Sequence, residues 1–348
     1  MSEVVGDDAA GDLTNLGLCR HLRDDKAITK SVLIIGDGNF SYACAFVRSV
    51  MTYDPSGDVL QRLHIRATSL DTHIELLRMY PGAAAHVDEL KRHDNVRVLH
   101  GINGTKLDEY KDMFGIASFD VIVFNFPHYA EGGNKRNKIN KHRQLLSQFF
   151  HSCNSVLASD GQVWVTLCAG QGGTPAETIV RPVGDTWQVA QCAASSALTL
   201  LNVHAVPTDA LFKLGYNNVG HRLQEKAFRT HASLTHVFCR ESLGKVACHP
   251  LTWTRDISFW VSDTFAEDKL APVIEGVYGP KVNVFLENID VYTDDQGRRA
   301  KGYRLTLSSR TMALSKEYVN AKTDEVTDIL DSHDWSCSAE SIVGQPQA

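Results

Sequence analysis

An amide, an aromatic ring, a rigid turn and an imidazole follow one another at Asn125, Phe126, Pro127 and His128. The apolar run at residues 119–124 precedes them, so we expect them at the carboxyl end of a buried strand, where ligands bind in open α/β sheets. An asparagine side chain both donates and accepts, which suits the edge of a nucleobase, and an aromatic ring can stack on the base. Taken alone, the pattern slightly favours a plain turn, because Asn-x-Pro is common in turns.

A glycine turn follows the apolar run at residues 32–35, and apolar residues at helical spacing follow the turn. Such a turn lets a ligand approach the backbone closely because glycine has no Cβ, and the helix N-terminus adds unpaired N–H groups. The predicted cofactor-binding turn comprises Gly36, Asp37, Gly38, Asn39, Phe40 and Ser41. A GxG after a strand is about as often a plain tight turn.

Asp71 closes the next apolar run, at residues 63–70. An acidic residue at the end of the second strand of such a unit can accept hydrogen bonds from a ribose diol. Aspartate is also a favoured N-cap, so Asp71 is an equally good candidate for the first residue of the following helix. The residue type does not separate the two roles.

A basic segment lies beside the predicted strand end, at residues 132–143, and contains no acidic residue. Contacts with phosphates are the obvious use of such a segment. Its five cations are Lys135, Arg136, Lys138, Lys141 and Arg143. A run of charge is more often a solvated face, but its position next to the strand end favours RNA binding.

The composition is that of a globular protein, since 43% of the 348 residues are hydrophobic and 22% are charged. This length exceeds one average domain, so two domains are expected. No apolar run approaches the length of a membrane span, and the acidic N-terminus lacks the features of a signal or transit peptide. We therefore expect no membrane association and a cytoplasmic location.

The net charge of −6 is unevenly placed: ten Lys/Arg oppose sixteen Asp/Glu from His249 onwards, whereas the preceding residues balance at 25 against 25. Bulk charge does not indicate a nucleic-acid binder, so any basic surface must be local. The eight cysteines and fifteen histidines show no CxxC or HExxH spacing. We expect neither a metal site nor a disulfide framework.

Seven strand-like runs alternate with helical stretches over the first 240 residues, which predicts an α/β fold with a Rossmann-like parallel sheet and helices on both faces. The runs lie at residues 32–35, 63–70, 96–100, 119–128, 162–168, 198–205 and 233–239. The last run is not followed by a further helix. This ending suits a methyltransferase-type sheet better than a dinucleotide dehydrogenase.

The chain from His249 onwards predicts a C-terminal α+β domain of the ferredoxin-like type, with the order βαββαβ. Its expected elements lie at residues 256–261, 266–277, 282–292, 302–308 and 315–330, with a last segment near Trp335. The expected organisation is a polar segment 1–30, a Rossmann-fold domain 31–240, a linker 241–248, a ferredoxin-like domain 249–340 and a tail 341–348. Five cations, Arg298, Arg299, Lys301, Arg304 and Arg310, could form a positive strip on this acidic domain, and the first four are the candidate RNA-binding residues; the alternative is ordinary charged strand faces.

With these residues in view, the first 240 positions resemble the uridine-N3 ribosomal-RNA methyltransferase-like family of Rossmann-fold enzymes. The matching segments are IIGDGNFSY, ATSLD, FDVIVFNFPH, NKHRQLLSQFF, GQVWVTLCAGQGGTP and LTHVF. The resemblance implies S-adenosylmethionine as cofactor, bound at the turn 36–41 with Asp71 towards the ribose, and a target-base motif at 125–128. The family tends to have aspartate where this chain has Asn103, whose amide could still bond the adenine.

Residues 249–340 resemble the ferredoxin-fold anticodon-binding domain that ends the RNA-binding subunit of phenylalanyl-tRNA synthetases. The resemblance rests on TRDISFWV, YRLTLSSRTMALSKEYVN and the Asp-rich turn before Gly297. The last strand differs, because that family typically closes on a basic residue. The pairing of the two domains resembles the proteins that contain a ferredoxin-fold anticodon-binding domain behind a methyltransferase-like one.

These resemblances imply methylation of an RNA base, with uridine N3 of ribosomal RNA as the first hypothesis. His128 would then be the candidate general base, because a histidine pKa lies near working pH. The same residue could equally donate to a carbonyl group or only shape the loop. A tRNA-directed methyltransferase is the second hypothesis. The third is a non-catalytic RNA-binding or ribosome assembly factor, with Asn103 as a sign of lost cofactor binding. A ribosomal-RNA substrate is also compatible with a nucleolar location.

Overall fold

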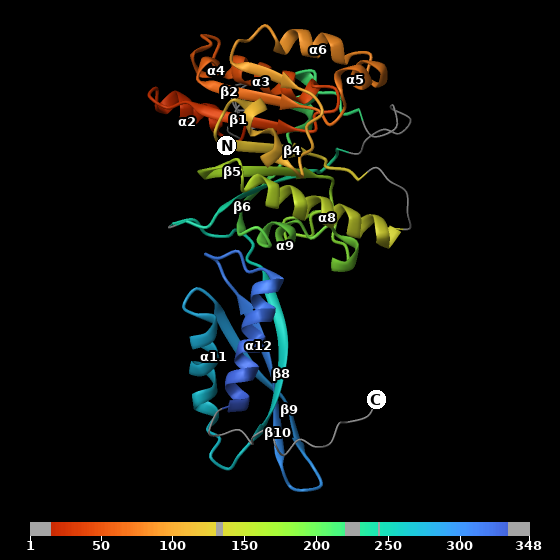
Figure 1. Ribbon diagram of the computed structural model, residues 1–348. Helices are drawn as coiled ribbons and strands as arrows, with labels where there is room; N and C mark the ends of the chain where they lie inside the picture. Colours follow the sequence, from red (N-terminus) through yellow and green to blue (C-terminus); the bar gives the residue numbers. More distant parts are fainter. Residues whose placement is uncertain (1–14, 130–134, 220–229, 243, 333–348) are drawn as a thin grey trace, which may run out of the picture. The chain divides into compact units, whose positions relative to one another are not determined.

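The computed structural model describes residues 15–129, 135–219, 230–242 and 244–332 (Figure 1). The chain divides into two compact units between Arg240 and Glu241. We call them the large unit, up to Arg240, and the small unit, from Glu241.

A seven-stranded sheet with the strand order β3-β2-β1-β4-β5-β7-β6 forms the centre of the large unit. Its strands are β1 (Lys30–Ile35), β2 (Leu63–Thr68), β3 (Val96–Leu99), β4 (Phe119–Asn125), β5 (Leu157–Leu167), β6 (Leu198–Ala205) and β7 (Leu234–Arg240). All neighbouring pairs from β3 to β5 are parallel. The α/β class with a Rossmann-like sheet is thereby confirmed.

One strand of the sheet runs against the others. β7 is antiparallel to both of its neighbours, β5 and β6. The sheet is therefore mainly parallel, with β7 as the antiparallel strand, and the expectation of a methyltransferase-type sheet stands.

Helices cover both faces of the sheet. The helices of the large unit are α2 (Leu18–Asp24), α3 (Ser41–Tyr53), α4 (Asp58–Gln61), α5 (His73–Met79), α6 (Ala83–Leu90), α7 (Lys111–Phe114), α8 (Lys135–Cys153), α9 (Val189–Ala194) and α10 (Thr208–Lys213), with the short 3-10 turns η1 (Leu107–Tyr110) and η2 (Val183–Asp185). None of the described helices of the chain combines the length and apolarity needed to span a bilayer.

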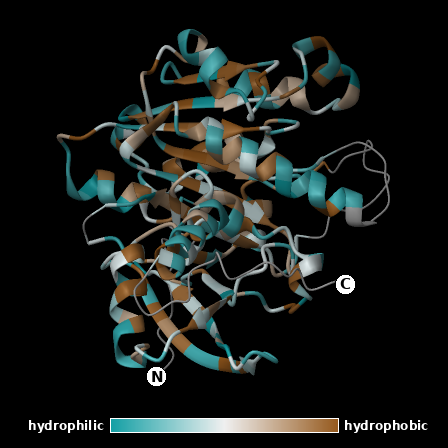
Figure 2. Ribbon diagram, turned by 60° about the horizontal axis from the view of Figure 1, so that its bottom comes forward, coloured by the Kyte–Doolittle hydropathy of each residue, from teal (hydrophilic) through white to brown (hydrophobic). Residues whose placement is uncertain are grey.

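The alternation of β1 divides the core between the two faces. Val32 and Ile34 pack in one cluster with Phe46 of α3. On the other face, Phe149 of α8 meets Phe124 of β4 with the ring centres 4.8 Å apart. Burial on both faces explains why the strands read as continuous apolar runs, and Figure 2 shows them in predominantly hydrophobic colours.

The small unit contains a three-stranded antiparallel sheet in the order β8-β10-β9. Its elements are β8 (Thr252–Val261), η3 (Glu267–Lys269), α11 (Leu270–Tyr278), β9 (Asn283–Thr293), β10 (Arg299–Ser308) and α12 (Lys316–Ser332). Apolar residues of both helices and the sheet share one core, which includes Ile274, Tyr303 and Val326. The α+β unit is confirmed as far as α12; the expected last segment near Trp335 lies outside the described residues.

Candidate active site

The order of the large sheet reverses between β1 and β4, which are neighbours with Ile35 opposite Phe124. Ligands in open α/β sheets bind at such a switch point, beyond the carboxyl ends of the strands. The turn at 36–41 follows β1, and the segment 125–128 begins at the last residue of β4. The fold therefore brings together the two segments that the sequence singled out independently.

The first turn depends on glycine at two close approaches. Gly36 has φ +64°, and a Cβ on it would lie 3.0 Å from the ring of Phe124. A Cβ on Gly104, in the loop after β3, would lie only 2.7 Å from the Ile35 side chain. Each glycine thus allows a close approach at the carboxyl ends of β1 and β4 that a larger residue would obstruct.

Asp37 is buried and serves the helix that follows it. Its carboxylate accepts a hydrogen bond of 2.7 Å from the Ala43 N–H, in the first turn of α3. The residue at the N-cap position, Phe40, is left-handed and has no side chain that could cap the helix. Burial raises the pKa of Asp37 to about 7, although backbone N–H groups of the helix end oppose this increase. Asp37 thus holds the turn against α3.

This buried carboxyl predicts a pH dependence of stability. Folded Asp37 keeps its proton up to about pH 7, whereas the unfolded chain releases it near 3.8. The folded state binds more protons in between, so stability falls as the pH rises, by about 1.4 kcal/mol per pH unit. We expect Asp37→Asn to remove this slope in urea unfolding curves between pH 4 and 7. Parallel pH curves for the variant and the wild type would contradict the assignment.

Asn39 and Ser41 hold a distant loop in place. The Asn39 amide and the Ser41 hydroxyl both donate to the Asn217 carbonyl, at 3.2 and 2.9 Å, and the Asn217 N–H donates back to Ser41 Oγ at 3.0 Å. Both side chains are buried. Their polar groups join the turn to the loop at Asn217. Contact of these two side chains with a cofactor stays a prediction.

Asp71 does not cap the helix that follows. Thr72 is the N-cap of α5, in a reciprocal capping box with Glu75. The helix-cap alternative for Asp71 is therefore wrong. Among the described residues, its carboxylate has no hydrogen-bond or ion-pair partner, and burial, followed by the charge of Glu75, raises its pKa. A half-buried carboxylate without a partner is a site prepared for an external donor.

Tyr80 connects Asp71 with the glycine turn. The charge of Asp71 contributes to the raised pKa of Tyr80, after burial, so the two side chains lie near each other. The Tyr80 hydroxyl is also the nearest atom to a Cβ built on Gly38, at 3.6 Å. Asp71, Tyr80 and Gly38 therefore border the same space at the edge of the sheet.

Asn103 follows β3 and forms an Asx turn. Its Oδ1 accepts from the Thr105 N–H at 3.0 Å and from the Thr105 hydroxyl at 2.8 Å. Its NH₂ group has no hydrogen-bond partner among the described residues. This bonding leaves the NH₂ group of Asn103 as a hydrogen-bond donor. The aspartate that is usual at this position in the family that the sequence resembles can only accept hydrogen bonds.

The end of β4 carries backbone strain. Phe126 has φ +50°, a conformation that bulky residues rarely adopt, and its N–H donates to the Thr166 carbonyl of β5 at 2.8 Å. Such strain costs of order 1–3 kcal/mol and clusters at functional sites. The chain therefore turns abruptly after Asn125, with Pro127 buried and His128 exposed.

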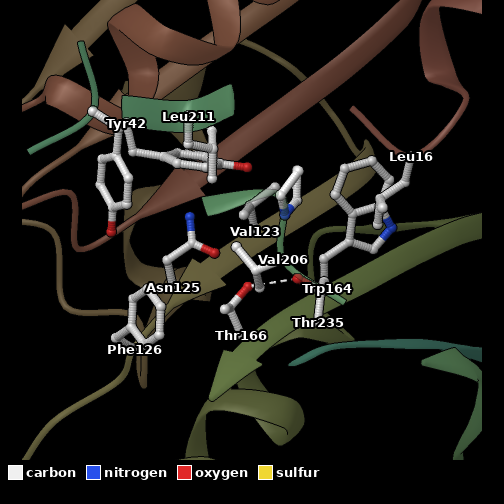
Figure 3. A pocket seen from close by; sticks show the side chains of 12 residues that line it. Leu16, Tyr42, Val123, Asn125, Phe126, Trp164, Thr166, Val206, Leu211 and Thr235 are labelled. Atoms are coloured by element: carbon white, nitrogen blue, oxygen red, sulfur yellow. Dashed lines mark hydrogen bonds between the residues drawn. The ribbon is translucent and has the colours of Figure 1, made fainter. Parts of the chain in front are cut away.

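A small pocket lies beside Asn125, whose amide points into it (Figure 3). Burial raises the pKa of the neighbouring Tyr42 hydroxyl to about 12, although a hydrogen bond with the Asn125 side chain lowers it. Beside Asn125 in the sheet, the hydroxyls of Thr166 and Thr235 bond each other at 2.9 Å. The volume of about 20 Å³ holds one water molecule and is too small for a nucleobase.

His128 belongs to a cluster of rings that we did not expect from the sequence. Its Nδ1 lies 3.2 Å from Nε2 of His142, on α8. The His142 ring stacks on Trp187, with ring centres 4.1 Å apart. The sequence does contain a sign that His142 is buried, because this residue falls at helical spacing on the apolar stripe of α8 that includes Ile139 and Leu146. Its place in the basic segment hides this sign.

The cations of the basic segment differ in their surroundings. Arg143 donates to the Val183, Gly184 and Thr186 carbonyls, at 2.7 to 3.1 Å, and thereby braces this loop. Lys138 is exposed, and the Lys141 ammonium lies 5.4 Å from the centre of the Tyr129 ring. The side chains of Lys135 and Arg136 lie outside the described part of the chain. Phosphate binding by this segment stays a prediction.

The predicted positive strip of the small unit is neutralised by acidic partners. The ion pairs are Arg298–Asp294 at 2.7 Å, Arg299–Asp263 at 3.5 Å, Lys301–Glu267 at 2.9 Å and Arg304–Asp256 at 2.8 Å. Each of these four cations thus has a carboxylate within reach, so together they carry little net charge of their own, whereas Arg310 has no ion pair among the described residues. RNA binding by these four residues stays a prediction. Within the described residues, no group of His, Cys, Asp or Glu side chains could hold a metal ion.

Comparison with known proteins identifies one matching family model, described as "BMT5-like: rRNA (uridine-N3-)-methyltransferase BTM5-like", over residues 33–218. Two curated relatives are ferredoxin-fold anticodon-binding domain-containing protein 1 of Homo sapiens, 36% identical over 211 residues, and its homologue of Mus musculus, 34% identical over 226 residues. These matches cover 61% and 65% of this chain, and 31% and 33% of the relatives. The chain thus spans about a third of their length.

A further relative is a chloroplastic/mitochondrial phenylalanine–tRNA ligase of Arabidopsis thaliana, 35% identical over 75 residues. That match covers 21% of this chain and 17% of the ligase.

Proposed function

This chain belongs to the BMT5-like family of methyltransferases, and we propose that it is an S-adenosylmethionine-dependent RNA methyltransferase acting on uridine N3 of ribosomal RNA. The observation that carries the proposal is the meeting of two kinds of site at one sheet edge. Asp71 offers an unpartnered carboxylate near the turn after β1, while Asn125 ends the neighbouring strand β4 and His128 follows it.

The residues on the cofactor side fit S-adenosylmethionine. The Asp71 carboxylate can accept hydrogen bonds from both hydroxyls of a ribose. The Asn103 NH₂ group can donate a hydrogen bond to a ring nitrogen of adenine. The glycine turn lets the ligand approach the backbone. When bound, this cofactor supplies a methyl group on a positively charged sulfur, which is the electrophile of the reaction.

The residues on the substrate side fit a uracil ring. N3 of uracil lies between two carbonyl groups and carries a proton that must leave before the nitrogen can attack a methyl carbon. The Asn125 amide points into the small pocket, so it can reach one of these carbonyls through the single water that the pocket holds, and the Phe126 ring can bound the plane of the base. His128, exposed at the strand end, can accept the N3 proton.

The size of the pocket restricts the substrate. Because the space beside Asn125 holds only a water molecule, the target uracil must lie against the outer strand end. A base stacked inside a helix cannot reach that position, so the target is single-stranded or flipped out.

The experiment that tests the proposal incubates the full chain with methyl-labelled S-adenosylmethionine and either ribosomal RNA or tRNA, followed by nucleoside analysis. We expect label in N3-methyluridine of ribosomal RNA. Label confined to tRNA would overturn the ribosomal assignment. Failure to bind the cofactor at all would instead favour the non-catalytic RNA-binding factor.

A tRNA substrate is the second candidate, and the small unit favours it. This unit has the βαββα order of the predicted anticodon-binding domain as far as α12, and one relative is a tRNA ligase. The paired cations of the unit weaken this candidate, because their charge is compensated within the unit.

The basic segment yields a prediction on RNA affinity. Neither the Lys138 nor the Lys141 ammonium has an ion-pair partner among the described residues. If each contacts one phosphate, the double variant Lys138→Gln/Lys141→Gln should lower the slope of log affinity against log salt by about 1.4 on single-stranded RNA. The matched control is Lys106→Gln/Lys322→Gln, whose lysines are ion-paired on the surface. Equal slopes for both double variants would mean that the segment is a solvated face.

A further inference from the structure

His142 lies within the basic segment but is almost completely buried, with 5% of its surface exposed. Its Nδ1 lies 2.6 Å from the Lys138 carbonyl, one turn earlier on α8. A carbonyl oxygen can only accept a hydrogen bond, so Nδ1 of His142 must carry a proton. In the neutral ring, this leaves the lone pair on Nε2.

The lone pair of His142 faces the segment that follows β4. The Tyr129 N–H donates to Nε2 at 3.3 Å, and His128 Nδ1 lies 3.2 Å from the same atom. Since Nε2 of a neutral His142 has no proton to give, His128 Nδ1 must be the donor in this contact. A neutral His128 with its proton on Nδ1 has its own lone pair on Nε2.

The surroundings of His142 favour the neutral ring. Burial lowers its pKa; the hydrogen bond to the Lys138 carbonyl acts in the opposite direction, and the charge of Lys138 lowers it further. The Trp187 ring stacks on His142 at an interplanar angle of 20°, which fixes the orientation of the imidazole. A second protonation would also place an N–H against the Tyr129 N–H.

We propose that His142 is a positioning residue that holds His128 in the tautomer with the proton on Nδ1, so that Nε2 is the atom that accepts the substrate proton. The tautomer follows from this chain alone, whereas its use in catalysis rests on the proposed function. In that reaction, His128 Nε2 takes the proton from uracil N3, and the N–H electron pair stays on the nitrogen. That pair then forms the bond to the methyl carbon while the carbon–sulfur bond breaks and its electrons stay on sulfur.

The test is the tautomer of His128, read from the ¹⁵N chemical shifts of its ring in the full chain at a pH where the ring is neutral. His128→Gln assigns the signals. We expect the proton on Nδ1 in the wild type and a redistribution between the two nitrogens in His142→Phe. That variant keeps a ring against Trp187 but removes the acceptor. His142→Gln restores an acceptor oxygen close to the place of Nε2 and should restore the tautomer.

A rate measurement accompanies the spectra. By analogy with residues that orient a ligand through one hydrogen bond, we expect kcat to fall about 10- to 100-fold in His142→Phe and to recover in His142→Gln. The affinity for S-adenosylmethionine and the unfolding temperature should stay near wild type in both. An unchanged His128 tautomer in folded His142→Phe would overturn the inference. If His128 carries its proton on Nδ1 as expected but the wild type transfers no methyl group, the inferred tautomer is correct and the proposed function is refuted.

Discussion

Replacing His128 by alanine is expected to lower kcat for RNA methylation by about 10²- to 10⁴-fold, the usual contribution of a general base. The imidazole lies at the exposed end of β4, where the N3 proton of a bound uracil would be. Without it, the nitrogen attacks only in the small fraction of substrate that has already lost its proton. The measurement is single-turnover methyl transfer to a saturating ribosomal-RNA fragment, with cofactor affinity measured separately.

The matched control for this variant is His151→Ala. His151 lies on the exposed surface of α8, the helix that also carries His142. Its removal should leave both the rate and the affinity unchanged. Equal single-turnover rates for His128→Ala and the wild type would contradict the assignment of His128 as the base.

Removing the charge of Asp71 is expected to weaken S-adenosylmethionine binding by about 10- to 100-fold, because hydrogen bonds to a charged group contribute about 1.5–3 kcal/mol. The reason is the unsatisfied, half-buried carboxylate that lies next to Tyr80 and the glycine turn. Asp71→Asn keeps the size of the side chain, and Thr72 still caps α5. The dissociation constant is measured by calorimetric titration.

Asp88→Asn is the control for Asp71→Asn. It removes a carboxylate from the exposed side of α6, away from the turn, since Asp88 has no hydrogen-bond partner among the described residues. We expect it to bind the cofactor like the wild type. If both variants bound equally well, the ribose role of Asp71 would be wrong.

Much of the large unit could be predicted from local patterns. The strand at residues 198–205 has the predicted limits, and the other buried runs became strands within a few residues. Apolar runs bounded by glycine or polar residues are local signals, and they suffice to place the ends of β1 and β4. The direction of β7 was not predictable in this way, because it depends on which strand lies next to it.

The parts of the site that depend on distant partners could not be read from the sequence. Arg143 belongs to the basic run, but three carbonyls of a loop forty residues away occupy its guanidinium. The cations near β10 bind carboxylates that lie between 4 and 48 positions away. Spacing alone shows which groups are charged, whereas the fold decides which charges remain uncompensated.

Asp71 and His142 both show that the residue type alone does not determine the role of a side chain. Asp71 lost one of its two predicted roles because the adjacent Thr72 forms the capping box. His142 gained a role because its position on the apolar stripe of α8 brings it against Trp187 and His128. In both cases the residue type was compatible with several roles, and packing selected among them.

The most direct test of the central claim is calorimetric titration of the full chain with S-adenosylmethionine and its demethylated product, in the wild type and in Gly38→Arg. Gly38 has an ordinary backbone conformation, and a Cβ there would lie in van der Waals contact with Tyr80 and Val219, so an arginine side chain would fill the space near Tyr80. Gly82→Arg, at a position with nothing within 4 Å of a built Cβ, is the control. The account predicts saturable binding by the wild type and by Gly82→Arg, and none by Gly38→Arg. A wild type that binds neither ligand, or a Gly38→Arg variant that binds as well as the wild type, would contradict a cofactor site at the end of β1.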